Sequence, residues 1–146
     1  EEPLLEWAPR NGPDGTYAYV GMGNNTTWGA AAHWGAPDMG FATYPAPGEW
    51  HDIAVVFDGA QERIYVDGVL DSSEDKTLNI HIGATAGGSN PYFFRVGTTQ
   101  NGEFRATLTL AVLEMFTVAL TEDEIARLPA GPIVIPNAVR NWTLFD

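Results

Sequence analysis

The residues best suited to bind a ligand lie in one glycine-rich stretch of the chain. Two amides, two indoles, an imidazole and a carboxylate occur there among small residues: Asn24, Asn25, Trp28, His33, Trp34 and Asp38. Sugars present apolar ring faces to aromatic side chains and hydroxyls to amide or carboxylate acceptors. The stretch therefore predicts a carbohydrate site. The competing interpretation is packing, with Trp34 in the core and His33 bonded to a backbone carbonyl.

Three aspartates are the candidate ligands for a metal ion. Hard cations such as calcium need several oxygen ligands carried by flexible loops. Asp14, Asp38 and Asp71 lie in or beside predicted turns, and calcium is the one cofactor we expect. No EF-hand spacing organises them, and aspartate also favours turns for backbone reasons, which is the competing interpretation. The histidines are too dispersed along the chain to predict a zinc site.

The sequence offers no pair of carboxylates arranged for glycoside hydrolysis. A retaining glycosidase needs two carboxyl groups about 5 to 5.5 Å apart on either side of one bond. Glu122, Asp123 and Glu124 are consecutive and begin a predicted helix, where they act on the helix dipole, and Glu114 stands alone on its strand. We therefore expect no enzymatic activity.

The elements that must position these residues are centred on a predicted hairpin at residues 48–71. Apolar residues alternate in both of its runs, and Asp58-Gly59 and Asp67-Gly68 mark two turns. Alternation bounded by Asp-Gly predicts a β-hairpin with one buried face. That face carries Ile53, Val55, Phe57, Ile64 and Val66, with Arg63, Tyr65 and Asp67 opposite.

Other elements follow from the same patterns. Strands are predicted at residues 4–8, 16–22, 28–34, 77–83, 92–96 and 104–118. The glycines and alanines at 28–34 indicate close approach to another backbone or to a ligand. Thr121 and Glu124 have the spacing of a capping box and predict a short helix that ends before Pro129. Trp50 is assigned to the core with its indole N–H bonded.

Composition limits the partners. The chain has 146 residues, with seven basic against nineteen acidic residues and a formal net charge of −12. Without a basic patch to neutralise phosphates, a nucleic-acid partner is excluded. No apolar run reaches the roughly 18 residues of a membrane span, so no membrane insertion is expected. The absence of cysteine excludes disulfides and thiolate metal sites.

The amino-acid sequence of the hairpin resembles that of a known family. Its matching residues are Gly48, Trp50, His51, Ala54, Phe57, Asp58, Gly59, Tyr65, Val66, Asp67 and Gly68. They resemble the central signature of laminin-G-like domains in the concanavalin A-like lectin/glucanase superfamily. LEMFTVALTEDEIARL, at residues 113–128, is similar to the closing element of that family. WGAAAHWGAPDMGF, at residues 28–41, is similar to a subgroup in secreted proteins of planctomycete-type bacteria.

The resemblance implies an all-β fold, an antiparallel two-sheet sandwich of the concanavalin A-like jelly-roll type with one short C-terminal helix. We expect residues 1–128 to form the sandwich and residues 129–146 to be an extension or an edge strand. Related domains have strands before the counterpart of residue 1. We therefore expect an N-terminally incomplete domain whose missing strands a companion fragment or subunit supplies.

The resemblance also implies a class of function. We expect a non-catalytic recognition or adhesion module of a larger exported protein, extracellular or periplasmic, with carbohydrate as its ligand. One alternative is a structural or protein–protein interaction domain that completes a partner chain. A further alternative is a fragment of a glycoside hydrolase or polysaccharide lyase, because this fold carries many functions.

Overall fold

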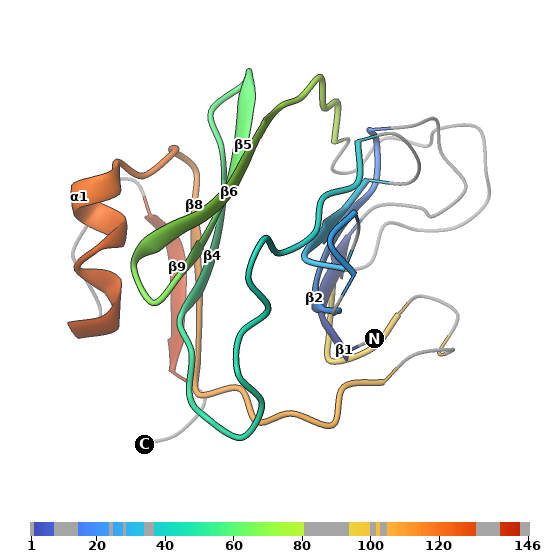
Figure 1. Ribbon diagram of the computed structural model, residues 1–146, viewed down its shortest axis with the longest axis vertical. Coiled ribbons are helices and arrows are strands. Elements are labelled where there is room, and N and C mark those ends of the chain that lie inside the picture. Colours follow the sequence, from blue (N-terminus) through green and yellow to red (C-terminus); the bar gives the residue numbers. More distant parts are fainter. Residues whose placement is uncertain are drawn as a thin grey trace.

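The computed structural model describes residues 2–7, 15–23, 25–27, 29–33, 37–80, 94–99, 102, 105–130 and 138–143. The elements within them are β1 (Glu2–Trp7), β2 (Ala18–Met22), β3 (Ala31–Ala32), β4 (Ile53–Phe57), β5 (Gln61–Val66), β6 (Val69–Asp75), β7 (Arg95–Val96), β8 (Val112–Phe116), α1 (Glu122–Ile125), the 3-10 turn η1 (Leu128–Ala130) and β9 (Ala138–Thr143) (Figure 1).

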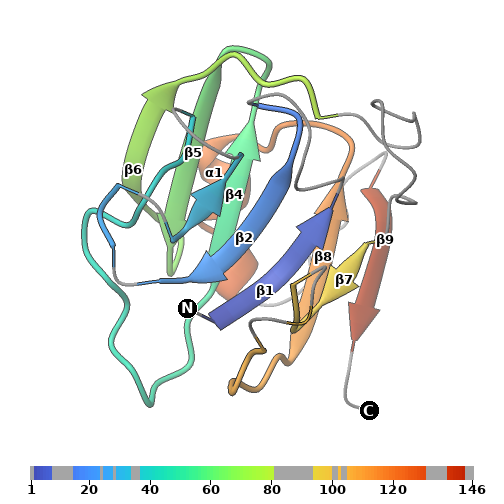
Figure 2. The ribbon, with the colours of Figure 1, turned by 90° about the vertical axis from the view of Figure 1, so that its right-hand side faces the viewer.

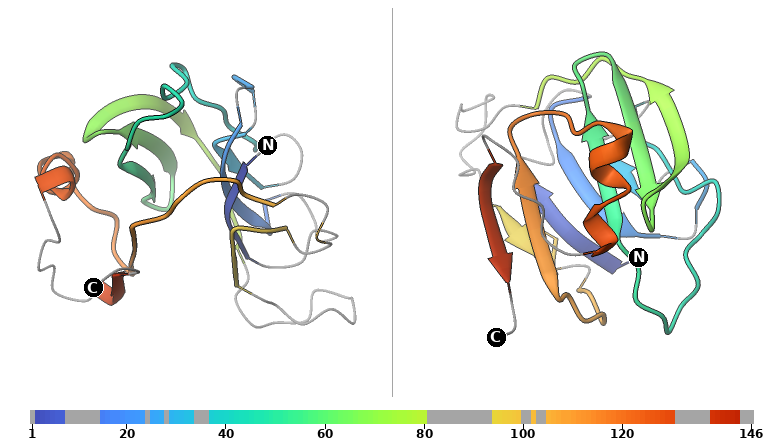
Figure 3. Two further views of the ribbon diagram at one scale, coloured as in Figure 1. Left: turned by 90° about the horizontal axis from the view of Figure 1, so that it is seen from below. Right: turned by 90° about the vertical axis from the view of Figure 1, so that its left-hand side faces the viewer.

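Two antiparallel layers face each other, and α1 covers the outer side of one of them (Figures 1 and 2). One layer has the strand order β3-β2-β1-β7, and the other contains β4-β5-β6. β9 pairs antiparallel with β8, and this pair lies next to β4 in the second layer (Figure 3). The predicted all-β two-sheet sandwich with a short helix near its C-terminal end is confirmed.

The hairpin of β4 and β5 forms with the predicted register and provides one wall of the core. Val55 lies opposite Ile64, and Ile53 lies opposite Val66. All four pack against buried residues of the facing layer and its loops, namely Ala30, Ala31, Met39 and Phe41. Period-two alternation therefore identified these four side chains correctly as ones that enter the space between the sheets.

The other face of the hairpin is also buried, which corrects the prediction of a single buried face. Tyr65 is only 1% exposed, and it packs with Val56, Leu120 and Ile125. The last two belong to α1 and the segment before it, so the helix covers this face. A strand covered on both sides can be apolar almost throughout, as the sequence IAVVF of β4 is.

The helix begins at the predicted capping box. The backbone N–H of Glu124 donates to Thr121 Oγ1 at 3.3 Å, and the Thr121 N–H donates to Glu124 Oε2 at 2.8 Å. The helix then packs against the turn between β5 and β6, because a Cβ on Gly68 would lie 3.1 Å from Ala126 Cα. No helix in the described part of the chain is long and apolar enough to cross a membrane.

Glycines allow two backbones to touch beside β2, as the composition of this stretch predicted. The Gly23 N–H donates to the Gly29 carbonyl at 2.9 Å, and a Cβ on Gly23 would lie 2.8 Å from Gly29 Cα. A Cβ on Gly40 would lie only 2.1 Å from the carbonyl oxygen of Asn25. Any side chain at these positions would push the 23–29 segment away from its neighbours.

Three predicted strands are shorter than expected. Among the described residues of the region predicted at 104–118 only β8 is a strand, and among those of the region at 28–34 only β3 is. Residues 77–80 are not in a strand, and residues 81–83 lie outside the described residues. Before β8, the backbone N–H and the hydroxyl of Thr107 both donate to the Glu2 carboxylate. This segment is thus bonded through a side chain of β1, a contact that alternation along one strand does not reveal.

Candidate functional site

The residues predicted to bind sugar fall partly within the described structure. Asn25, His33 and Asp38 are described, whereas Asn24, Trp28 and Trp34 lie outside the described residues. His33 and Asp38 come together, since the His33 backbone N–H donates to Asp38 Oδ1 at 2.6 Å. Asn25 is bonded within its own loop, where its Oδ1 accepts from the backbone N–H and the hydroxyl of Thr27.

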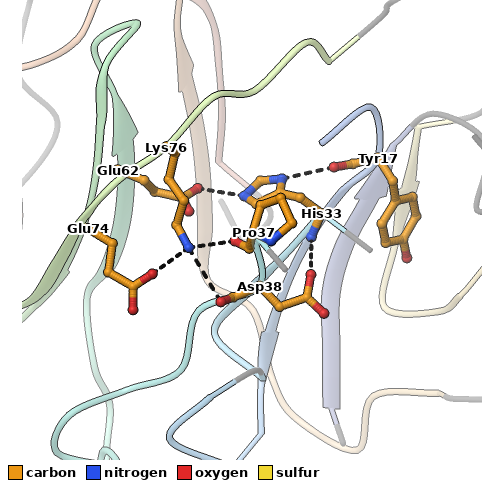
Figure 4. Close-up of polar contacts among 7 residues, drawn as sticks. All are labelled: Tyr17, His33, Pro37, Asp38, Glu62, Glu74 and Lys76. Atoms are coloured by element: carbon orange, nitrogen blue, oxygen red, sulfur yellow. Dashed lines mark hydrogen bonds and ion pairs between the residues drawn. The ribbon is translucent and has the colours of Figure 1, made fainter. Parts of the chain in front are cut away.

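The His33 side chain faces the interior between the two layers (Figure 4). It is 3% exposed, its Nδ1 lies 2.9 Å from the carbonyl oxygen of Tyr17, and its Nε2 lies 2.8 Å from Glu62 Oε1. The Tyr17 hydroxyl in turn donates to Glu6 Oε1 at 2.6 Å. A buried polar chain thus runs from β1 through Tyr17 and His33 to β5 and connects the two sheets.

The hydrogen-bond roles determine how many protons the His33–Glu62 pair holds. A carbonyl oxygen only accepts, so Nδ1 of His33 must carry a hydrogen. The short contact between Nε2 and Glu62 Oε1 then requires one further proton, on either the imidazole or the carboxyl group. The pair is neutral overall in both cases. That is the form in which an imidazole and a carboxyl group are buried at least cost.

Lys76 makes a second connection close to the first. Its side chain is 3% exposed, and its Nζ donates to the Pro37 carbonyl at 2.6 Å and to Glu74 Oε2 at 2.5 Å (Figure 4). A longer contact of 3.4 Å reaches the carbonyl of Asp38. These bonds fasten residues 37 and 38 to the end of β6. The conformation of the loop that carries Asp38 is therefore held from both layers.

The predicted metal ligands do not meet in the described structure. Asp14 lies outside the described residues, and Asp38 is bonded to the His33 N–H. The Asp71 carboxylate accepts from the backbone N–H groups of Ala42 and Thr43 at 2.7 and 2.8 Å. Within the described part of the chain, no three His, Asp or Glu side chains are grouped to hold a metal ion. The calcium site stays a prediction from the sequence.

An open pocket of about 450 Å³ lies on the surface at another place. The loop after Phe41 forms one side through Tyr44 and Ala46, and β6 forms the other through Val69, Leu70 and Asp71. His51, which precedes β4, also lines the pocket. Tyr44 is 39% exposed and Leu70 44%, so an aromatic ring and an aliphatic side chain are open to solvent beside a carboxylate.

Trp50 adjoins this pocket in sequence and is 69% exposed, so its assignment to the core is wrong. β4 begins only at Ile53, and the alternation of a strand therefore does not extend back to residue 50. A tryptophan this exposed gives up much of the free energy that burial would provide.

His51 holds the pocket together through both ring nitrogens. Nδ1 lies 2.8 Å from Asp67 Oδ2, and Nε2 lies 3.0 Å from the carbonyl oxygen of Ala46. Both partners are acceptors, so both nitrogens must carry hydrogen and the ring is an imidazolium. The hydrogen bond to Asp67 accordingly raises the pKa of His51, and the charges of Asp67 and Glu49 add to this.

Asp67 responds in the opposite direction. Burial works to raise its pKa, but the hydrogen bonds from His51 and from the Asp52 backbone N–H outweigh burial and lower it. Asp67 also has a positive φ of 52°, in the turn that joins β5 to β6. The carboxylate thus stays ionised where it fixes both the turn and the imidazolium.

Neither this pocket nor the buried carboxylates were predicted from the sequence. The signal for Glu62 was present, because Glu62 shares the parity of Ile64 and Val66 on the buried face. Two polar residues of the pocket were named from the sequence, His51 as part of the hairpin and Asp71 as a candidate metal ligand. Tyr44 comes from another segment, and the proximity of the three residues is decided by the tertiary structure.

The fold defines the class of protein: a two-layer antiparallel β-sandwich, here with a pocket that Tyr44 and the edge strand β6 line. The chain belongs to the concanavalin A-like lectin/glucanase superfamily, whose laminin-G-type sequence model matches residues 7–126. This confirms the resemblance at the level of the superfamily. Searches of curated proteins and of solved structures found no match.

Proposed function

We propose that this domain is a non-catalytic recognition module that binds carbohydrate in the pocket between Tyr44 and Asp71. The single observation that carries the proposal is the exposure of Tyr44 beside the Asp71 carboxylate, which the backbone N–H groups of Ala42 and Thr43 hold in place. Trp50 is exposed further along the same loop. Membership of a superfamily that includes lectins supports it. The proposal places the site on the loop at residues 42–50 rather than on the stretch first expected, which holds Asn25 and His33.

The chemistry of the pocket suits a sugar. An aromatic face can cover the C–H face of a pyranose ring, and the aliphatic surface of Val69 and Leu70 extends that contact. Each Asp71 oxygen accepts one backbone N–H and retains a lone pair that can accept from a sugar hydroxyl. Because the bonds to Ala42 and Thr43 fix the carboxylate before binding, little conformational entropy is lost when a sugar binds.

The arrangement of the carboxylates supports a non-catalytic role. Glu62 and Glu74 lie opposite each other on β5 and β6, which makes them a candidate pair for hydrolysis. The Glu62 side chain is only 2% exposed, so a glycosidic bond cannot reach it, and Glu74 is paired with Lys76. A hydrolase needs both groups at one bond.

The resemblance of the sequence to its family also suggests the kind of protein that contains this module. We propose that it is part of a larger exported protein of the planctomycete-type subgroup, with calcium as an optional cofactor and with further strands supplied by a preceding segment or a companion chain. Size-exclusion chromatography with light scattering tests for a companion. A monomeric, fully folded chain of 146 residues would contradict the need for one.

The protein–protein interaction domain stays as a second candidate, and one observation favours it. Val69 is 69% exposed beside Leu70 on β6, which gives an apolar surface that a protein could cover as well as a sugar. The two candidates differ in the chemistry of the ligand, and the experiment below separates them.

A glycan array, probed with and without EDTA, tests the proposal. We expect binding to neutral glycans by the wild-type domain and its loss in the Tyr44→Ala and Trp50→Ala variants. Phe94→Ala is the matched control, because Phe94 is 42% exposed but lies next to β7 in the other layer, against Trp7. An array silent in both conditions, or equal losses in all three variants, would contradict the carbohydrate site.

A further inference from the structure

The loop that carries Tyr44 is held at two points. At its start, the Asp71 carboxylate accepts from the N–H groups of Ala42 and Thr43. Further along, the Ala46 carbonyl accepts from Nε2 of His51 at 3.0 Å. His51 is attached on its other side to Asp67 in the turn between β5 and β6. The imidazolium is thus a bridge between the pocket rim and the rigid hairpin.

From this bridge we propose that His51 is a pH-dependent latch of the pocket, which releases the rim at Ala46 when the ring loses a proton. The inference rests on the proposed function, because it concerns the regulation of that same pocket. It goes beyond that function by naming the group that controls the rim and the direction of the control.

The choice of bond that breaks follows from the charges. A neutral imidazole has one N–H and can serve only one of its two acceptors. The bond to the Asp67 carboxylate is charge-assisted, whereas the bond to the Ala46 carbonyl is not, and charge-assisted bonds are about twice as strong. The remaining hydrogen therefore stays on Nδ1. The lone pair on Nε2 then faces the carbonyl of Ala46, and the two repel each other.

The direction in pH follows from linkage. Because the pKa of His51 is raised in the folded protein, its contribution is complete below the pKa of the unfolded chain. That contribution is lost as the pH rises through the folded value. The rim is therefore closed at low pH and is released as the pH rises through the folded pKa of His51.

Other charged groups near the latch do not reverse this direction. The carboxylates facing it are Asp67 in the turn, Glu49 in the loop, Asp52 before β4, Asp71 on β6 and, beyond Asp52, Glu114 on β8. Burial, and then the charge of Asp52, raises the pKa of Glu114 from its ordinary value of 4.5. All of these groups are carboxylates, and an ionised carboxylate favours the charged form of the imidazole, so none of them reverses the direction.

Nitrogen-resolved NMR of the free protein tests the latch without any sugar. We expect His51, identified by the loss of its signals in His51→Gln, to titrate above the ordinary value of about 6.5. Its neutral form should carry hydrogen on Nδ1, and the amide signals of Tyr44 and Ala46 should follow the same midpoint. The proposal would be overturned if the amide signals of Tyr44 and Ala46 did not change as His51 titrates. It would also be overturned if neutral His51 carried its hydrogen on Nε2.

Asp67→Asn is the matched variant. Asparagine tolerates the positive φ at this position, and its oxygen still accepts from the Asp52 N–H. Its amide nitrogen then donates to Nδ1, so a neutral His51 carries hydrogen on Nε2 and keeps the bond to Ala46. We expect the rim of this variant to stay closed from pH 6 to pH 9. If the rim of Asp67→Asn were released with rising pH as in the wild type, this would contradict the latch.

Cellohexaose, as a neutral sugar chain, links the latch to binding. If it binds at pH 6, we expect its affinity to fall about three- to tenfold at pH 9 in the wild type and to change little in Asp67→Asn. Equal wild-type affinity at both pH values would contradict control of the pocket by the latch. Absence of binding at pH 6 counts against the proposed function alone, and the NMR result still decides on the latch.

Discussion

Replacement of Glu62 by leucine tests the buried polar chain between the two sheets. Glu62 is 1% exposed, and its Oε1 lies 2.8 Å from His33 Nε2. In Glu62→Leu the imidazole keeps its bond to the Tyr17 carbonyl, while Nε2 faces an apolar side chain. We expect His33 to be neutral in this variant, with one buried acceptor left without a partner.

The size of the effect follows from that single unpaired nitrogen. Leaving one buried acceptor unsatisfied costs about 1–3 kcal/mol of the free energy of unfolding. Removing one partner of a fixed ion pair would cost more, about 3–5 kcal/mol, but an imidazole avoids this by releasing its proton. At about 2–4 °C per kcal/mol for a domain of this size, Glu62→Leu should lower Tm by roughly 2–12 °C.

Glu62→Gln is the control, because its amide occupies nearly the same volume and can donate to Nε2 of a neutral His33. We expect it to lose less than about 1 kcal/mol, since both nitrogens of His33 stay bonded. The assay is urea and thermal unfolding of the two variants and the wild type at pH 7. Circular dichroism verifies that all three keep their strands.

Two results would refute this reasoning. If glutamine destabilises the domain as much as leucine does, the hydrogen bond between His33 Nε2 and the side chain at position 62 does not account for the loss of stability. If Glu62→Leu is as stable as the wild type, the chain from β1 to β5 does not help to hold the sheets together. A loss above 5 kcal/mol would instead indicate that His33 stays charged without its partner.

Two further variants test the loop and the helix. Gly40→Ala should lower the free energy of unfolding by about 1–3 kcal/mol or more, because its Cβ would lie 2.1 Å from the carbonyl oxygen of Asn25. Urea unfolding measures this loss, and a variant as stable as the wild type would show that the 25–27 loop moves freely. Thr121→Ala should cost about 1 kcal/mol at pH 7 through loss of the cap, seen as a lower urea midpoint. Hydrogen bonds from Thr121 lower the pKa of Glu124, so the stabilisation by this carboxylate is present above its unfolded pKa and is lost as the pH falls through the folded value. The deficit of Thr121→Ala should therefore shrink towards pH 3, and a constant deficit would contradict the reciprocal cap.

Much of the fold was predictable because its signals are local. The hairpin follows from alternation between two Asp-Gly turns, and the start of the helix follows from Thr121 and Glu124. Each needs only the geometry of a few consecutive residues. The superfamily also follows from sequence wording, and the match over residues 7–126 confirms it.

The site was less predictable because its residues are assembled from separate segments. Glu62 has the parity of the buried face, but the sequence does not say that His33, 29 residues earlier, meets it across the two layers. Trp50 is a residue type that we assigned to the core, yet it precedes the strand and is exposed. Tyr44, His51 and Asp71 line one pocket only because the loop lies against β6.

The amino-acid sequence by itself determined the two-sheet class, the hairpin register and the helix cap, since alternation, turn chemistry and capping act over a few neighbouring residues. Only the tertiary structure decided which polar groups are enclosed and which aromatic rings face solvent. Burial depends on what the opposite layer and the loops place against each side chain, and those partners lie far away along the chain.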